Sequence, residues 1–537
     1  MNNMEQKLSI DRLTNRLIFL SKKKEHDDCL IYFIHYMHSC NPALYAKYKR
    51  LINFSIYCSF KSKNSRKINK IINKERFVRI YNNMKNTYDK IIKLNSTHIY
   101  DFFSEFDQES LHNGIGFDGE FLKHWIFISS YNTNPSYYLS GSIDRYQDEI
   151  EYIKTKFGFN MHECVHVAKA IFSVLNSKKP IRENIIKSIK YYRMFTISDI
   201  SSKLNENKIY IDASIVKYII DFFVFEENKT PQNIFTRPES DFSPILRIKE
   251  EKYLLYDEYN LCESLYGKMN FVLSDIPDYK AKHSEISGNC LEHRTFSMLR
   301  KNLSQENSFL RQGIKIFDPK RKKGQKTITD IDVLLIFGKC AVVFQCKTKR
   351  LKESSRLGDE SSLKADFNAA MSGAYEQGMK CINAIKNCDE YEFYYDKIEK
   401  IRTEAMHNIN LFYILCITNE NYPSSILQSN SSIINNKKYK IIQIDIISLK
   451  IILKHIKTDK FILYLEFREV IYNGQFMFSD EMNIFALFHW LITKGGCENM
   501  KDICEKIPSL CDENRINSII FENLMELNAW SLETIIQ

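Results

Sequence analysis

The sequence predicts an α/β core within an otherwise α-rich, multidomain chain, and three observations lead to this class. Residues 327–347 form two runs rich in β-branched and apolar residues around a Gly-Lys pair, which is typical of a β-hairpin. Short apolar runs at 411–418 and 439–446 have the length of buried strands. The chain has 537 residues, of which 44% are hydrophobic, so it can form apolar cores in roughly two to four domains.

Four segments are expected along the chain. Residues 1–240 show helical spacing with few prolines and carry excess basic charge, which suits either nucleic-acid contact or a sensor role. Within them, residues 197–223 have the pattern of a small helix-turn-helix or winged unit, which could contact DNA but is more often plain scaffolding. Residues 241–284 read as a connector with a short hairpin, and 285–425 as the α/β core. Residues 426–537 are expected to add a strand and a helical region packed on that core.

The predicted hairpin aligns two acids, an amide and a lysine. If the Gly-Lys pair at 338–339 forms a type II′ turn, Asp332 lies opposite Gln345 and Asp330 lies opposite Lys347. Side chains two apart on a strand share a face, so the four polar groups project from the same side of an apolar ribbon. A buried ribbon rarely carries such a row without a partner for it. The two predicted strands are Thr327–Phe337 and Cys340–Lys347.

This arrangement resembles the PD-(D/E)xK nuclease superfamily: an acid in an Ile-Asp-Val strand, a short turn, and an apolar strand ending in Gln-x-Lys. It is most similar to the Mrr-like and nuclease-related-domain branches, in which Gln often replaces Glu. The helical pattern opening at Ser287 resembles the helix that contributes a further acid, here Glu292, and Gln377 resembles a polar residue aimed at the site. The resemblance covers roughly residues 285–425. It implies a restriction-endonuclease-like core, with a mixed central sheet flanked by helices.

The resemblance also implies hydrolysis of phosphodiester bonds with Mg²⁺ or Mn²⁺. Asp332 would be the carboxylate ligand, Gln345 a neutral oxygen ligand, and the Cys346 backbone carbonyl a third ligand. Lys347 would orient or deprotonate the attacking water and stabilise the charge of the transition state. Glu292 would complete the ligand set or help to place a second ion.

Two further residues are accessory in this prediction. Asp330 lies opposite the lysine and could tune it, and Gln377 lies on a helix that faces the site. Because Gln345 is uncharged, the site has one negative charge fewer than the Glu form, so we expect no tightly bound second metal ion.

The sequence therefore predicts a metal-dependent nuclease that acts on DNA rather than RNA. Restriction of foreign DNA, such as phage DNA, is what the family likeness implies for its role. Two readings without catalysis compete with this one. Gln and Lys at a strand end can be rim residues and Asp-x-Asp a solvated strand face, or the chain could bind nucleic acid without cutting it.

Basic residues concentrate near the N-terminus. Residues 1–100 contain 20 Lys and Arg against 7 Asp and Glu, whereas the net charge of the whole chain is +10. Most of this excess lies at 47–93 among aromatic residues that could stack on bases, although a solvated helical face explains it equally well. The aromatic residues are Tyr45, Tyr48, Phe54, Tyr57, Phe60, Phe77 and Tyr81. A second basic cluster leads into the hairpin and comprises Lys320, Arg321, Lys322, Lys323 and Lys326.

One motif favours a different chemistry. Residues 162–166 spell H-E-x-x-H, which on a helix places His162 and His166 on one face, where Zn²⁺ could bind, with Glu163 as the general base of a zinc metallopeptidase. Such an enzyme needs a third protein ligand, and Glu183 is the nearby candidate. A helix with two surface histidines is the favoured reading of so short a motif.

The remaining features concern the cellular setting. The 14 cysteines include no C-x-x-C pair and several fall in predicted core strands, which favours free thiols in a reducing cytoplasm. No apolar run reaches the length of a membrane span, and the start of the chain has no apolar signal core. We expect a cytoplasmic protein with no membrane partner, and the sequence allows a homo-oligomer.

Overall fold

The computed structural model describes most of the chain, and its described parts form two compact units. The described residues are 3–21, 29–34, 42–61, 74–104, 124, 135–178, 193–225, 234–235, 242–303, 308–321, 327–395, 399–420, 422, 439, 441–473, 478, 480–510 and 513–528. The first unit comprises Met1–Asp101, Asn134–His283 and Ala529–Gln537, and the second Phe102–Thr133 and Ser284–Asn528. The predicted α/β core and the predicted C-terminal region thus belong to one unit.

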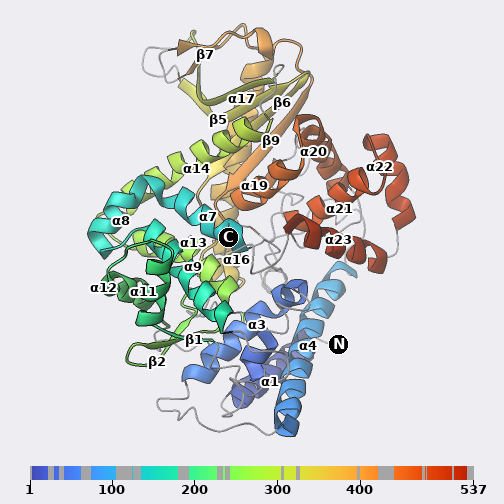
Figure 1. Cartoon of the computed structure of the whole chain (residues 1–537). Coiled ribbons are helices and arrows are strands. Elements are labelled where there is room, and N and C mark those ends of the chain that lie inside the picture. Colours follow the sequence, from blue (N-terminus) through green and yellow to red (C-terminus); the bar gives the residue numbers. More distant parts are fainter. Residues whose placement is uncertain are drawn as a thin grey trace. The chain divides into compact units, whose positions relative to one another are not determined.

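The first unit is mainly helical (Figure 1). Its helices begin with α1, which packs on α3, and α7 and α9 both pack on α13. The bounds of these elements are α1 Asn3–Ser21, α3 Pro42–Lys61, α4 Lys74–Ser104, α7 Pro135–Tyr146, η1 Gln147–Glu149, α8 Ile150–Phe157, α9 Met161–Ser177 and α13 Glu258–Ser274.

Four of the aromatic residues of α3 and α4 that could stack on bases are packing residues instead. The side chains of Tyr48, Phe54, Tyr57 and Phe77 are all buried, and Tyr81 packs against a buried cluster. A base cannot stack on a ring whose faces are already covered. The side chains of Tyr45 and Phe60 lie outside the described residues.

A winged-helix arrangement lies within the first unit. The predicted helix-turn-helix segment forms α11 (Ile197–Glu206) and α12 (Ala213–Phe222), which pack on each other and on α9. A three-stranded sheet in the order β1-β3-β2 completes it, and the predicted hairpin provides two of its strands. Their bounds are β1 Met194–Thr196, β2 Ile245–Lys249 and β3 Lys252–Leu255.

The connector predicted for 241–284 is helical beyond the β2–β3 hairpin. Helix α13 is capped by Asp257, whose side chain accepts a hydrogen bond from the Tyr259 amide, and α14 follows at Lys280–Leu303. The prediction missed α13 because polar residues lie on its buried faces. Ser264 is buried with its hydroxyl bonded to the carbonyl of Asn260, also buried, so the apolar periodicity is interrupted.

The second unit is built on a mixed sheet of seven strands in the order β10-β9-β6-β5-β4-β7-β8, flanked by helices (Figure 1). Strands β6, β9 and β10 run parallel, and the other neighbours pair antiparallel. This confirms the predicted mixed sheet with flanking helices. The strands are β4 Ser308–Phe317, β5 Thr327–Phe337, β6 Cys340–Lys347, β7 Glu392–Tyr395, β8 Glu399–Lys400, β9 Leu411–Thr418 and β10 Ile441–Asp445.

Strands β5 and β6 form the hairpin predicted from the sequence, with the same bounds. Gly338 has a φ of +57°, and Lys339 is not among the residues with positive φ, as a type II′ turn requires. The ladder runs from Phe337 opposite Cys340 to Val333 opposite Phe344 and ends there. The predicted pairs of polar residues therefore lie beyond the last ladder pair, where the strands separate.

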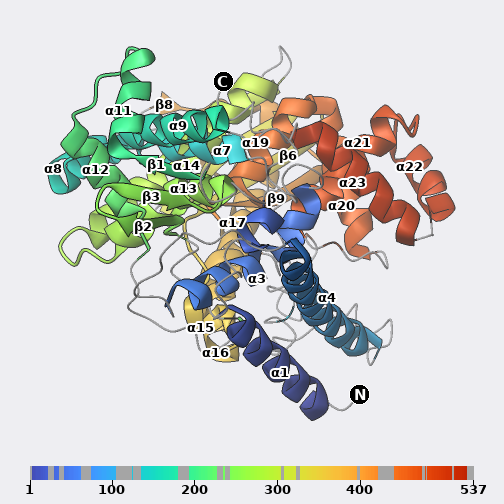
Figure 2. The ribbon, with the colours of Figure 1, turned by 60° about the horizontal axis from the view of Figure 1, so that its bottom comes forward.

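Helices cover the sheet and extend from it. Helix α17 packs on β5, β6 and β9, and α19 packs on β10 (Figure 1). The helices α20 to α23 form a group joined by the contacts of α21 with α20 and α23 (Figure 2). None of the described helices combines the length and the apolar composition needed to cross a lipid bilayer. The remaining bounds are α15 Glu353–Arg356, α16 Glu360–Phe367, η4 Asn368–Ser372, α17 Gly373–Lys386, η5 Glu404–Met406, α19 Ile446–His455, α20 Thr458–Asn473, α21 Glu481–Thr493, α22 Met500–Lys506, η6 Ile507–Leu510 and α23 Glu513–Asn528.

A glycine sets how closely α17 approaches the sheet. A Cβ atom added to Gly378 would lie 2.6 Å from Cγ2 of Ile414 on β9. We expect Gly378→Ala to lower the free energy of unfolding by about 1–3 kcal/mol, because the helix must move away from a well-packed strand. Chemical denaturation followed by circular dichroism would measure the change.

The matched control is Gly288→Ala on α14, where an added Cβ meets no atom within 4 Å. That substitution should stabilise the protein by about 0.5–1 kcal/mol, since alanine favours the helix. Equal effects of the two substitutions would contradict the close approach of α17.

Candidate active site

The site lies where β5 and β6 separate, and a side chain replaces the missing ladder bond. The Cys346 amide donates a hydrogen bond to Asp332 Oδ2 at 2.6 Å. One residue earlier on β6, Gln345 Nε2 donates to the Asp330 carbonyl at 3.2 Å. Neither bond joins a predicted pair, because Asp332 bonds to Cys346 and not to Gln345, and Gln345 bonds to Asp330. The structure brings Asp332 next to the segment that carries Gln345 and Lys347.

Gln345 has an oxygen without a partner. The residue is fully buried, and in the described part of the chain Oε1 makes no hydrogen bond. The Asp330 carbonyl can only accept, so the amide nitrogen must face it and the orientation of the side chain is fixed. A buried acceptor left without a partner costs about 1–3 kcal/mol. The oxygen that the sequence assigns to a metal ion is therefore the one that the protein leaves unsatisfied.

Gln377 on α17 positions the lysine. Lys347 Nζ donates to Gln377 Oε1 at 2.5 Å, and Gln377 Nε2 donates to Asp330 Oδ1 at 3.4 Å. Both accessory residues of the prediction thus contact the lysine or its partner. The charge of Lys347 also opposes the rise in pKa of the nearby Asp332 and Glu292 carboxyls.

Glu292 reaches the same region from α14. Its pKa is raised to about 7, chiefly by burial and then by the charges of Asp332 and Asp330, while Lys347 opposes the shift. The next turn of α14 contacts β6, where Cys346 Sγ lies 3.6 Å from Thr295 Oγ1. Glu292 is therefore close enough to the two aspartates for their charges to interact.

Asp332 is also held in an unfavourable environment for a charge. Its side chain is 7% exposed, and burial raises its pKa to about 6, against the opposing effects of the Cys346 amide and Lys347. Repulsion from Asp330 adds to the upward shift. A cation bound among these carboxylates would relieve both the burial cost and the repulsion.

The residues present fit a magnesium-type ion with oxygen ligands. Asp332 keeps one carboxylate oxygen free of the amide bond, and Gln345 Oε1 is unpartnered among the described groups. Because the N–H and C=O of one strand residue point to the same side, the Cys346 carbonyl also points toward β5. Carboxylate, amide and carbonyl oxygens are the ligands that Mg²⁺ and Mn²⁺ accept.

The three carboxylates of the site are not all close to one another. Within the described ranges, Glu292, Asp330 and Asp332 do not form a group whose ligand atoms all lie within 4.8 Å of one another. The group that meets this distance is Cys388, Asp389 and His407, which the sequence did not indicate because the two parts are far apart in the chain.

The H-E-x-x-H motif is used for helix capping. It opens α9, where the Glu163 carboxylate accepts a hydrogen bond from the Asn160 amide and binds Lys154 at 2.7 Å. Among the described residues no third ligand joins His162 and His166, and Glu183 lies outside that part of the chain. A carboxylate fixed as a cap and in an ion pair is poorly placed to act as a general base.

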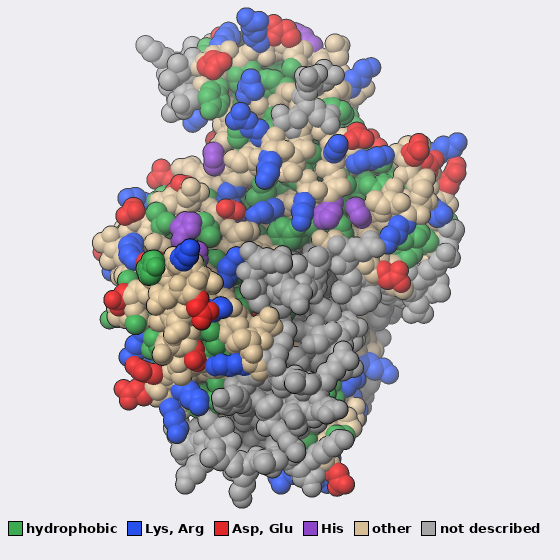
Figure 3. Space-filling view, viewed as in Figure 1, with side chains coloured by type: hydrophobic (Ala, Val, Ile, Leu, Met, Phe, Trp, Pro, Cys, Tyr) green, Lys and Arg blue, Asp and Glu red, His purple; other side chains and the backbone are tan. Residues whose placement is uncertain are grey.

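The second basic cluster is only partly described. Lys320 pairs with Glu390 at 2.9 Å and Arg321 with Asp318 at 3.3 Å, while residues 322–326 lie outside the described part. On the face seen in Figure 3, basic and acidic side chains of the described residues are interspersed. The described portion of that face therefore offers no uniform field for a phosphate backbone.

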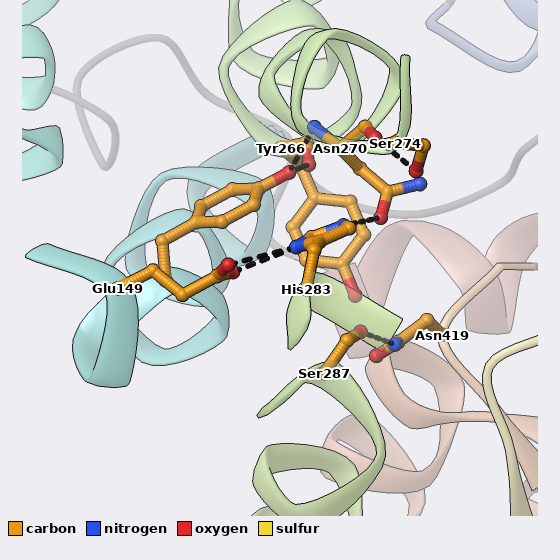
Figure 4. Close-up of polar contacts among 8 residues, drawn as sticks. Glu149, Tyr266, Asn270, Ser274, His283, Ser287 and Asn419 are labelled. Atoms are coloured by element: carbon orange, nitrogen blue, oxygen red, sulfur yellow. Dashed lines mark hydrogen bonds and ion pairs between the residues drawn. The ribbon is translucent and has the colours of Figure 1, made fainter. Parts of the chain in front are cut away.

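A buried polar cluster in the first unit was not predicted (Figure 4). His283 Nδ1 lies 2.9 Å from Glu149 Oε1, and its Nε2 lies 3.0 Å from Asn270 Oδ1. The Tyr146 hydroxyl accepts a hydrogen bond from the Asn270 amide and donates to the Tyr266 carbonyl. Both ring nitrogens of the histidine have partners, so this cluster is a packing network that joins η1, α13 and the start of α14.

Comparison of the chain with protein-family models, with curated proteins and with solved structures found no match. The interpretation of the site therefore depends on its own geometry and chemistry.

The raised pKa of Asp332 gives a stability prediction. A folded-state pKa of about 6 exceeds the unfolded value of about 3.9, so the contribution to stability is full below pH ~4 and is lost as the pH rises toward ~6. In the absence of divalent ions, we expect Asp332→Asn to raise the free energy of unfolding at pH 8 by about 1–3 kcal/mol. Asparagine still accepts the Cys346 amide bond.

Urea denaturation in a chelating buffer at pH 4.5 and pH 8 would measure this difference. Asp278→Asn, at an exposed position, is the control and should change little at either pH. A loss of stability in Asp332→Asn at pH 8 would show that the ionised carboxylate does not destabilise the fold.

Proposed function

We propose that this chain is a divalent-cation-dependent nuclease that hydrolyses DNA. The observation that carries the proposal is the buried, unpartnered Oε1 of Gln345, at the strand end where Asp332 binds the amide of the adjacent Cys346 and Gln377 holds Lys347. An amide oxygen, a carboxylate and an ammonium group at one strand end suit a metal ion and a phosphate more than they suit an apolar core.

Each residue has a distinct role in this mechanism. Asp332, Gln345 and the Cys346 carbonyl would hold Mg²⁺ or Mn²⁺, which when bound supplies a Lewis acid beside the scissile phosphate. Gln377 holds the Lys347 ammonium at the strand end, where it would orient the attacking water and stabilise charge on the phosphoryl group.

Glu292 supplies a group that exchanges protons near neutral pH. With its pKa raised to about 7, a substantial fraction of the carboxyl is protonated at pH 7. Such a group can accept a proton from water or donate one to a leaving oxygen at the working pH. Ion binding nearby would lower the pKa and favour the carboxylate.

The winged-helix arrangement supports DNA as the polymer. In helix-turn-helix proteins the second helix enters the major groove, and here that helix is α12. Its outer face carries the exposed side chains of Lys217 and Tyr218, the latter 67% exposed. A lysine and a tyrosine on such a helix can contact phosphates. Restriction of foreign DNA is a role that such an enzyme could serve.

The main test is cleavage of plasmid and linear DNA by the purified chain with Mg²⁺ or Mn²⁺. We expect Lys347→Ala and Asp332→Ala to reduce the rate by about a hundredfold or more, since each removes a group that acts on the reacting phosphate. Lys339→Ala, at the exposed turn of the same hairpin, is the matched control and should cleave normally.

The outcomes separate the proposal from its alternatives. Full activity in both site variants would refute the assigned roles. Salt-sensitive DNA binding without cleavage under any metal condition would favour a non-catalytic binding protein.

The contribution of α12 can be measured separately. We expect Lys217→Glu combined with Tyr218→Ala to weaken binding of duplex DNA severalfold and to reduce its salt dependence, because phosphate contacts are lost. Fluorescence anisotropy with a labelled duplex would report both effects. Lys501→Glu, an exposed charge on α22, is the control. Unchanged binding in the α12 variant would exclude this helix as a DNA contact.

A further inference from the structure

Three metal-ligand side chains meet at the end of the sheet that carries the β5–β6 turn. Cys388 and Asp389 follow directly after α17, and His407 follows η5, just before β9. Strands β7 and β8 lie between these two parts of the chain, within residues 390–406. The candidate active site lies at the other end of β6, because β9 begins opposite Cys340.

The geometry of the three side chains suits a tetrahedral ion. Cys388 Sγ, a carboxylate oxygen of Asp389 and a ring nitrogen of His407 all lie within 4.8 Å of one another. His407 Nε2 is 3.6 Å from Asp389 Oδ1, which is too long for a hydrogen bond. Two ligands bound at about 2.0–2.2 Å in a tetrahedral arrangement are about 3.4 Å apart. The observed spacing is therefore close to that of two ligands sharing one ion.

The burial of the three groups also fits a bound ion. Cys388 is 6% exposed, whereas the side chains of Asp389 and His407 are 82% and 42% exposed. The thiol would approach the ion from the protein side, and the carboxylate and imidazole from the solvent side. This leaves the fourth position to water. Thiolate, imidazole and carboxylate together are the ligand types that Zn²⁺ prefers.

We propose that Cys388, Asp389 and His407 bind one Zn²⁺ ion. The ion would cross-link the two ends of the segment 390–406, which carries β7 and β8. This cross-link would tie β7 to the end of α17. Strand β7 is held in the sheet by its pairing with β4, where Phe317 lies opposite Glu392. A cross-link at the base of a loop restricts the unfolded chain more than the folded one, so the bound ion would stabilise this edge of the sheet.

Co²⁺ is the probe for this site, because a thiolate bound to Co²⁺ gives a charge-transfer absorption that Zn²⁺ lacks. Titration of the metal-free full chain should show one equivalent of Co²⁺ bound with this absorption, and added Zn²⁺ should abolish it. Cys388→Ser should remove the thiolate absorption. His407→Gln, a change at a half-exposed position, should weaken Co²⁺ binding about tenfold or more without risk to the core.

Two control variants separate this site from the other candidate metal positions. The double variant His162→Ala with His166→Ala removes the imidazoles of α9, and Asp332→Asn alters the candidate active site. Both should keep the thiolate absorption of the wild-type chain, which reports the Cys388 position alone. Cys504→Ser, which removes an exposed cysteine, should behave in the same way.

The readout does not depend on DNA cleavage. The proposal for this zinc site therefore stands even if the nuclease proposal fails. Absence of Co²⁺ binding, or a thiolate absorption that persists in Cys388→Ser, would refute the proposal. Unchanged affinity in His407→Gln would do the same. Loss of the absorption in Cys388→Ser together with weakened binding in His407→Gln would establish the site.

Discussion

The hydrogen bond from the Cys346 amide to Asp332 Oδ2 determines how the β5–β6 hairpin ends. A regular ladder would pair this amide with a backbone carbonyl and would keep the two strands at their usual spacing. With a carboxylate as the acceptor, the ladder ends at the pair Val333 and Phe344, and the strands separate beyond it, toward Asp332 and Gln345. The buried amide stays satisfied, and the space between the strands is lined with polar atoms. The polar environment of Gln345 and Lys347 follows from this one difference: the carboxylate of Asp332, and not a backbone carbonyl, accepts the hydrogen bond of the Cys346 amide.

The cost of the arrangement is electrostatic. Burial and repulsion from neighbouring aspartates raise the pKa of Asp332 and of Glu292, and the Gln345 oxygen is buried without a partner in the described part. Proteins rarely keep several such groups together for packing alone, because apolar residues of the same volume would be more stable. A cation bound at this position, with a phosphate beside it, would offset both costs. It would neutralise the buried carboxylates and give the Gln345 oxygen a partner.

The local elements were predictable from the sequence, and the contacts between distant segments were not. The bounds of β5, β6 and β9 follow from β-branched runs and from the glycine at the turn, which are local signals. The register of the hairpin was also correct up to Phe344, but the change at Asp332 depends on a bond that no spacing reveals. The aromatic residues of α3 and α4 were misjudged because a lysine-rich helix has the same pattern whether its rings face bases or a core. Cys388 and His407 meet only through the path of the chain around β7 and β8.

The two outer strands of the seven-stranded sheet differ in character, and both limit how copies of this chain can associate. Strand β8 has two residues, Glu399 and Lys400, and both are exposed and charged. At the opposite edge, every residue of β10 is buried. A short charged border and a covered one both hinder the addition of a further strand from a neighbouring molecule. Neither border of this sheet is therefore suited to pairing with a strand of a second copy, which disfavours fibril growth through the sheet in the native state.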